Sequence, residues 1–479
     1  MDKINSSTKL SEGGGSTASA GSDCSAGGML LLFAACFTLF ALRNLEPIFS
    51  PNIYAEDGTW LGKIMQHGII DTAFGARDAF PVLGLILLEW LALKLNVAFF
   101  NGSIFLLPQS IFIVANTFCA LVAIAPVVAF RVALPLWIRL GFVACVVFMP
   151  TGSSGNEIFG RILNLGFLFP LLVICSIHVA RRTAYSAVFA LQLAFLLVAA
   201  LTFPVCLAIM GVWLLMEISI LGLQRDSNVT SSTMNPGRTI AGLAVVALGV
   251  ISMPPDVLTF QGGANLPYSQ EGLIDFAIGR LVAYPFVAGF YSALSDWIVV
   301  AVGFLLTALV IAVLIRSRKS ERALIALLVL GFGVYWAATA VMRSGLTSFF
   351  GTFENTYPDR YAYGLNVLGA WVAITTAYVL WQKRSLFWPL GALCLVFLCF
   401  NSLNMRSRTF QMSEPLHPMQ QYGDIRSMTC KMVAGTIPPS ITVERELVHV
   451  PIYPITEKNL WQMVVPRRVW DNTIEGQCQ

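Results

Sequence analysis

Long apolar runs, without a polar residue at every second position, are the feature that most limits how this chain can fold. Such runs recur along most of its 479 residues, and 104–130 is a clear example. A helix needs about 20 apolar residues to cross the hydrocarbon core of a bilayer. Backbone polar groups within lipid must be satisfied inside the segment itself, which favours helices over isolated strands. The runs therefore predict membrane-spanning helices.

The charge content favours the same fold class and excludes others. Charged residues make up 12% of the chain and apolar residues 56%, whereas a soluble domain has about 25% charged residues. So few charged residues cannot cover this apolar surface in a soluble enzyme, and the composition also excludes a disordered chain. The net charge of +4 is too small to indicate a nucleic-acid partner. We expect an all-α polytopic membrane protein.

The lengths of the apolar runs predict about eleven transmembrane helices. The predicted spans are 29–42, 104–130, 137–150, 163–180, 184–202, 204–223, 238–254, 294–315, 322–342, 361–381 and 385–402. Lys and Arg gather in every second connection, and such loops face the cytoplasm in membrane proteins. These basic residues are Arg131 and Arg139, Arg181 and Arg182, Arg225 and Arg238, the stretch 316–322, and Lys383 and Arg384. The pattern predicts a cytoplasmic N-terminus and an external C-terminus.

Composition divides the chain into three regions. Residues 1–27 are rich in Ser, Gly and Thr, which predicts a flexible cytoplasmic tail rather than a cleaved signal peptide. Residues 28–402 form the predicted membrane domain, with a long first outer loop at 43–103. Residues 403–479 are more polar and contain short alternating stretches. They predict a small extracytoplasmic appendage with a few strands.

Two segments leave alternatives open. Residues 79–95 are apolar enough to span, but a further span would reverse the later loops against the distribution of Lys and Arg. We therefore prefer a helix at the outer interface, with Glu89 and Lys94 reaching water; an additional span is the alternative. Cys430 and Cys478 would lie in an oxidising compartment, where they either pair or remain free thiols.

The densest polar cluster follows the first span. It contains Tyr54, Glu56 and Asp57, with Arg77 further along the loop. Adjacent carboxylates repel each other, which raises the pKa of one of them. Such a pair suits a base that removes a proton from a hydroxyl, or a site for Mg²⁺ or Mn²⁺. A solvated loop with aromatic residues at the membrane interface is the simpler interpretation.

Other polar residues stand at the entrances of later spans. Glu157 and Arg161 are four residues apart and would share a helix face, with Asn164 close behind them. Arg280 and Arg360 occupy similar positions in the second half of the chain. An arginine there can hold a phosphate by paired hydrogen bonds or can serve as an interface anchor.

These features together resemble the GT-C superfamily of integral-membrane glycosyltransferases, which use polyprenyl-phosphate-linked sugars. The resemblance rests on the stretch Tyr54-Ala55-Glu56-Asp57-Gly58, on 155–164, on Asp359-Arg360-Tyr361, and on the topology through about residue 402. Within the superfamily, the chain looks most like bacterial transferases that modify O-antigen lipopolysaccharide or other cell-envelope polysaccharides, including Gtr-type glucosyltransferases.

The resemblance implies an enzyme of the bacterial cytoplasmic membrane with its site on the outer face. Asp57 and Glu56 match the acidic pair of the family's first outer loop, and one of them would act as general base. The donor would be a polyprenyl-phosphate sugar, and the acceptor a polysaccharide or a lipid-linked molecule. Arg161, Arg280 or Arg360 would stabilise the leaving phosphate, while the lipid tail would lie between spans.

Two other functions compete with this hypothesis. A transporter or flippase for a lipid-linked saccharide would need ionisable residues at mid-membrane and two related halves. A polymerase or ligase of lipid-linked saccharides would need basic residues in a large later outer loop. The acids gather instead in the first outer loop, and the stretch 255–293 holds Arg280 alone among Lys and Arg, so we prefer the glycosyltransferase.

Overall fold

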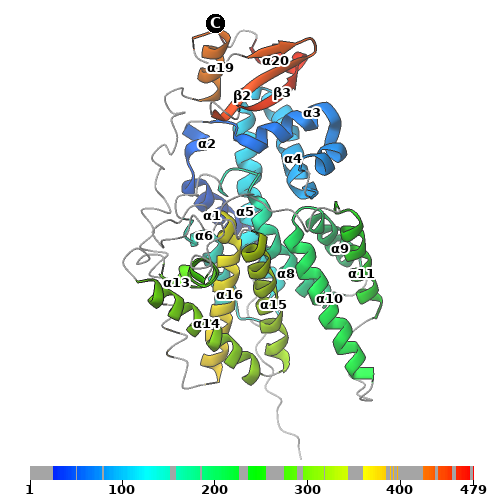
Figure 1. Ribbon diagram of the computed structural model, residues 1–479, viewed down its shortest axis with the longest axis vertical. Helices are drawn as coiled ribbons and strands as arrows, with labels where there is room; N and C mark the ends of the chain where they lie inside the picture. Colours follow the sequence, from blue (N-terminus) through cyan, green and yellow to red (C-terminus); the bar gives the residue numbers. More distant parts are fainter. Residues whose placement is uncertain are drawn as a thin grey trace, which may run out of the picture.

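The computed structural model describes most of the chain (Figure 1). The described residues are 25–49, 51–77, 80–151, 158–183, 186–225, 236–254, 274–287, 295–317, 319–342, 360–383, 424–436, 441–455 and 460–474, with the single residues 389, 392, 396 and 478. The predicted tail 1–27 falls mostly outside them, because the described part begins at Ser25. Most of the predicted span 385–402 also lies outside the described residues.

The fold is an apolar helical bundle, as the sequence predicts. The helices of the bundle are α1 (Ala26–Arg43), α5 (Leu107–Ala129), α6 (Leu136–Phe148), α8 (Phe169–Ala180), α9 (Ala187–Ala200), α10 (Pro204–Arg225), α11 (Pro236–Ile251), α14 (Asp296–Arg316), α15 (Lys319–Met342) and α16 (Arg360–Gln382). Each predicted span up to 361–381 corresponds to one of them. Within the described part, six helices have the length and apolar composition to cross a membrane. The chain is a multi-pass membrane protein.

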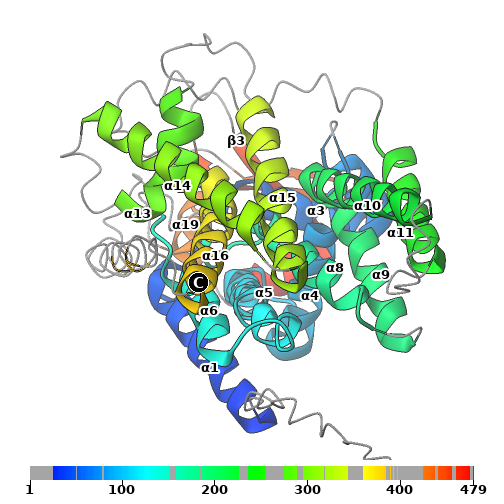
Figure 2. The same cartoon turned by 90° about the horizontal axis from the view of Figure 1, so that it is seen from below.

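Close packing and polar contacts hold α16 in the centre of the bundle. Figure 2 shows it between the group α8 to α11 on one side and α14 on the other. A side chain at Gly364 would meet the Phe167 carbonyl oxygen, so the helix approaches the chain before α8 closely there. Trp371 is fully buried and donates from Nε1 to the Phe142 carbonyl at 3.1 Å. Small residues and such hydrogen bonds are what join helices in lipid, where hydrophobicity does not.

The first outer loop folds into three helices. They are α2 (Glu46–Phe49), α3 (Ala55–Gly75) and α4 (Leu83–Phe100), and the short η1 (Ile104–Leu106) follows them. The segment 79–95 thus contributes the helix α4, whose length and composition also suit a membrane span. One expectation about it is wrong. Glu89 does not reach water but is completely buried, because it faces α3, whereas Lys94 is exposed.

The C-terminal residues form a small unit that docks on this loop. It contains α19 (Ile425–Val433), the antiparallel sheet β1 (Thr442–Glu444), β2 (Leu447–Ile455) and β3 (Leu460–Pro466), and α20 (Arg467–Ile474). The expected strands are therefore present, and Cys430 and Cys478 form a disulfide. Gln66 of α3 donates to the Val464 carbonyl at 2.8 Å. Because α3 covers the edge of β3, the sheet is part of the outer-loop assembly (Figure 1).

Candidate functional site

Asp57 lies in the first turn of α3 and is buried. The helix begins at Ala55, and the apolar Trp60 and Leu61 hold its first two turns in the core. The Asp57 Oδ1 atom accepts a hydrogen bond of 2.7 Å from the backbone N–H of Leu163. The N-terminus of a helix stabilises a negative charge. The local structure therefore presents one buried carboxyl group at a favourable helix end.

Glu89 of α4 provides a second buried carboxyl group at the same place. Its side chain is 0% exposed and its carboxyl group lies beside that of Asp57. A proton on either carboxyl group would allow a hydrogen bond between the two. Burial raises the pKa of Asp57 to about 6, although the hydrogen bond from Glu89, the charge of Arg161 and the Leu163 N–H all oppose the increase. A carboxyl with this pKa exchanges protons near neutral pH.

Arg161 joins the predicted second cluster to the first. Its Nη2 atom forms an ion pair with the Glu46 Oε1 atom at 3.2 Å, and Nη1 donates to the Asn52 carbonyl at 3.2 Å. The guanidinium also lies over the Tyr54 ring, 4.7 Å from its centroid. Asn164 is buried shortly after Arg161. Arg161 therefore anchors the chain that leads into α3.

An apolar cavity lies beside the carboxyl pair. Its ≈ 650 Å³ of empty space is partly open to the surroundings and is bounded by residues from α4, the chain before α8, and α10, α15 and α16. Leu163, whose N–H binds Asp57, is part of its wall, and so are Arg77 and Tyr361. The Arg77 guanidinium lies 5.4 Å from the Trp60 ring centroid and 5.5 Å from that of Phe80. The cavity thus combines an apolar interior, an arginine and nearby acids.

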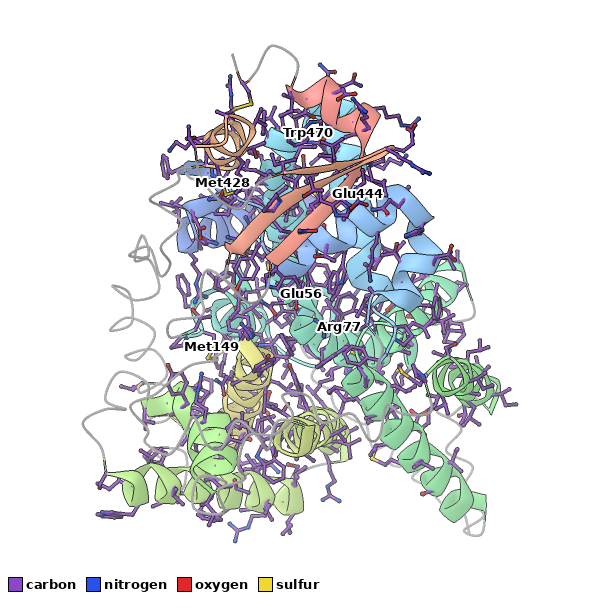
Figure 3. All side chains as sticks on the ribbon, turned by 45° about the horizontal axis from the view of Figure 1, so that its top comes forward. Glu56, Arg77, Met149, Met428, Glu444 and Trp470 are labelled. Atoms are coloured by element: carbon purple, nitrogen blue, oxygen red, sulfur yellow. A yellow bond between two sulfur atoms is a disulfide. The ribbon has the colours of Figure 1, made fainter. Side chains whose placement is uncertain are left out.

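The remaining predicted residues occupy different surroundings. Glu56 is half-buried next to Asp57, and Figure 3 shows Glu56 and Arg77 below the C-terminal sheet in that view. Arg360 is partly buried and donates to the Tyr361 hydroxyl at 3.2 Å, which places it at the cavity. Glu157 lies outside the described residues.

Arg280 is separated from this group. It lies in the π-helical segment η5 (Asp275–Ala283), is 1% exposed, and stacks on Tyr284 at 3.6 Å. The Asn366 side-chain amide can be oriented so that its nitrogen donates to the Leu281 carbonyl. Its oxygen then accepts a hydrogen bond from Arg280 Nη1 at 3.0 Å. These contacts describe an arginine that fastens η5 to α16. We therefore give Arg280 no part in the site.

The sequence places Glu46 in the first polar cluster but does not indicate the burial of Glu89 or the pairing of Glu46 with Arg161. Glu89 is the single acid in the apolar stretch 79–95, and an acid in such a stretch is expensive to bury and often functional. Glu89 gives this signal, but a helix at the membrane interface, as expected for 79–95, would allow the glutamate to reach water. The pairing of Glu46 with Arg161 joins residues 115 positions apart, and no local pattern indicates it.

The described residues do not form a metal site. None of them belongs to a group of three or more His, Cys, Asp or Glu side chains that could hold an ion. Asp57 and Glu89 bring two carboxyl groups together, fewer ligands than a divalent cation takes. We therefore derive no chemical step through Mg²⁺ or Mn²⁺.

Comparisons with known proteins give distant similarities in structure and none in sequence. No protein family and no curated protein sequence matches the chain. Among solved structures, an oligosaccharyltransferase from Archaeoglobus fulgidus, crystallised with zinc and sulfate, aligns with a TM-score of 0.41 and 12% identity. The alignment covers 85% of this chain and 56% of the archaeal one, so the chain spans little more than half of that protein. At this TM-score the likeness is too weak to assign a function.

Proposed function

We propose that this protein is a membrane glycosyltransferase that moves a sugar from a polyprenyl-phosphate donor to a polysaccharide or lipid-linked acceptor. One observation carries the proposal: the buried carboxyl groups of Asp57 and Glu89 lie behind the wall of an apolar cavity that Arg77 lines. The acceptor hydroxyl oxygen forms the new bond to the anomeric carbon of the sugar. The bond from that carbon to the phosphate oxygen breaks, and its electron pair leaves with the polyprenyl phosphate.

Asp57 is our choice for the base that takes the proton of the acceptor hydroxyl. Its pKa of about 6 keeps it ionised at neutral pH while still able to accept a proton. Because its side chain is 1% exposed, the acceptor must displace the wall at Leu163 to reach it. The half-buried Glu56 needs no such movement, so it is the alternative base.

The cavity provides a place for the lipid phosphate. An isoprenoid chain is apolar and fits a lining that includes Phe80, Leu85 and Phe203. Arg77, with Arg360 beside Tyr361, would stabilise the negative charge that develops on the leaving phosphate. Arg161 is committed to Glu46 and supports the base instead. The outer face of the bacterial cytoplasmic membrane is the location that we propose for this site, following the distribution of Lys and Arg.

A transfer assay tests the proposal. Purified protein in detergent is incubated with radiolabelled polyprenyl-phosphate hexoses and an envelope polysaccharide extract, beside Asp57→Asn and Glu56→Gln. We expect transfer by the unmodified protein, loss with Asp57→Asn, and retention with Glu56→Gln. Loss with Glu56→Gln alone would move the base to that residue. Absence of transfer from every donor, together with movement of the lipid-linked sugar across proteoliposomes, would establish the transporter instead.

A further inference from the structure

The turn between α9 and α10 holds the N-terminus of α4. The Thr202 hydroxyl accepts a hydrogen bond of 2.7 Å from the Gly84 N–H. The Leu83 N–H donates to the Leu201 carbonyl at 2.9 Å. The residue before α4 is Val82, whose side chain has no group that could cap the helix. Thr202 therefore supplies, from another pair of helices, the cap that the sequence around the start of α4 lacks.

The contact between the turn and α4 is close and buried. Thr202 is 1% exposed, and its hydroxyl is oriented because it donates to the Val198 carbonyl at 2.6 Å. A side-chain carbon at Gly84 would lie 2.5 Å from the Thr202 Oγ1 atom and 2.7 Å from the Phe169 ring. Glycine is therefore needed for the backbone of α4 to approach the turn this closely. The sequence provides both halves of the contact, a glycine on α4 and a hydroxyl on the turn.

The position of α4 decides where the Glu89 carboxyl group lies. Glu89 follows Gly84 by about 7.5 Å along the same helix. Apart from Asp57, no described group forms a hydrogen bond with this buried carboxyl. Its place beside Asp57 is therefore set by the helix that carries it. The turn that holds this helix also borders the cavity, because Thr202 and Phe203 belong to the cavity wall.

We propose that Thr202 is a positioning residue, which sets the place of Glu89 beside Asp57 through the N-terminus of α4. This role rests on the proposed function, since it concerns the base of that reaction. Thr202 acts through α4 and takes no proton itself. The donor cavity and the carboxyl pair then share one support, because the turn that lines the cavity also holds the helix that carries Glu89.

The ionisation of Asp57 reports the position of Glu89. Within the described part of the chain, the charged or titratable groups that act on Asp57 are Glu89 of α4, Arg161 before α8 and Glu56 of α3. Of these, Glu89 lies on the helix that Thr202 holds. A hydrogen bond with Glu89 lowers the pKa of Asp57. Moving α4 away therefore raises that pKa, and the ionised base is lost at a higher pH.

Two substitutions of Thr202 test the proposal. Thr202→Val keeps the size of the side chain but removes the hydroxyl, and it should raise the midpoint of Asp57 ionisation by about one pH unit. Thr202→Ser keeps the hydroxyl and should have the midpoint of the unmodified protein. Gly84→Ala separates the same contact from the α4 side and should shift the midpoint in the same direction. Thr183→Val is the matched control, because the Thr183 hydroxyl donates to the Val179 carbonyl at the other end of α8.

Infrared spectroscopy of the carboxyl bands, recorded against pH for the full-length protein in detergent, measures the midpoint without any substrate. Asp57→Asn and Glu89→Gln assign the bands, and the acidic limb of kcat in the transfer assay should move by the same amount. An unchanged midpoint in Thr202→Val, with a rate that falls equally at every pH, would overturn the proposal. Gly84→Ala decides in the same way if Thr202→Val does not fold.

The two readouts separate this proposal from the proposed function. A shifted infrared midpoint without transfer in any of the proteins would refute the glycosyltransferase, while the positioning of the carboxyl pair by Thr202 would stand. Normal transfer in the unmodified protein, with one midpoint shared by Thr202→Val, Thr202→Ser and Thr183→Val, would refute the positioning role alone. A shift in Thr202→Ser as large as that in Thr202→Val would show that packing, rather than the hydroxyl, holds α4.

Discussion

Buried acidic residues occur near both ends of α8, but their carboxyl groups have different contacts at the two ends. At the acidic end, defined by Asp57 and Glu89, two buried carboxyl groups lie beside each other. At the arginine end, defined by Arg181, Glu217 and Arg238, the carboxylate contacts a guanidinium at 2.8 Å. The twelve residues of α8 separate the ends by about 18 Å.

The difference shows which end is arranged for proton transfer. The Glu217 carboxylate contacts the Arg181 guanidinium and no second acid of the described residues. A carboxylate that is buried beside another acid is poised to exchange a proton. Arg161 forms an ion pair with Glu46, and its charge also acts on Asp57. The acidic end therefore has the arrangement that proton transfer needs.

The largest expected effect separates the two ends directly. Asp57→Asn should lower the transfer rate by about 10²–10⁴-fold, the usual contribution of a general base. Glu217→Gln should leave the rate within a few-fold, because it acts at the other end of α8. Initial rates of label transfer, with Tm measured for each variant, check this. Equal losses from both substitutions would show that burial, rather than proton transfer, explains the importance of Asp57.

The second prediction concerns the arginine of the acidic end. Arg77→Gln should reduce the rate by about 10²–10³-fold, because it removes a hydrogen-bond donor that would stabilise the negative charge developing on the leaving phosphate. Lys63→Gln changes a partly exposed cation of α3, the helix that ends just before Arg77; Lys63 donates to the Gly75 carbonyl, and the substitution should have little effect. Single-turnover rates at saturating donor make the comparison. An unchanged rate in Arg77→Gln would leave Arg360 as the phosphate ligand.

The sequence predicts the bundle well because each span carries its own apolar signal. The acidic loop was also visible, since Glu56 and Asp57 are adjacent in an otherwise apolar chain. The partners of Asp57 could not be predicted from the sequence. Leu163 is 106 residues away, and the contact with Glu89 depends on how α3 and α4 pack. Arg280 shows the converse, since its burial and its contact with Tyr284 could not be inferred from its place near a span entrance.

The third prediction uses pH to examine the two buried carboxyl groups. Asp57 acts as base only when ionised, so activity should be present above pH 6 and fall as pH decreases through about 6. Glu89→Leu removes the hydrogen bond that lowers the pKa of Asp57, so the acidic limb should move to higher pH. Glu89→Gln keeps an N–H donor and should leave the limb nearly in place.

The measurement is the pH profile of kcat for the three proteins. A limb that is identical in Glu89→Leu and in the unmodified protein would mean that Glu89 does not act through Asp57. A merely structural role for Glu89 would lower activity equally at every pH. The position of the limb, rather than the maximal rate, therefore identifies the function of this residue.

The smallest expected effect concerns the C-terminal sheet, which covers the acidic end but not the arginine end. A side-chain carbon at Gly62 would lie 2.8 Å from the Val464 carbonyl oxygen, whereas one at Gly211 of α10 would meet nothing within 4 Å. Gly62→Ala should therefore destabilise by about 1–3 kcal/mol through overpacking, while Gly211→Ala should be neutral or slightly stabilising. Because α3 carries Asp57 as well as Gly62, a few-fold loss of transfer should accompany the lower Tm in Gly62→Ala alone. A lower Tm with unchanged transfer would mean that the sheet supports the fold of the outer loop without positioning its base.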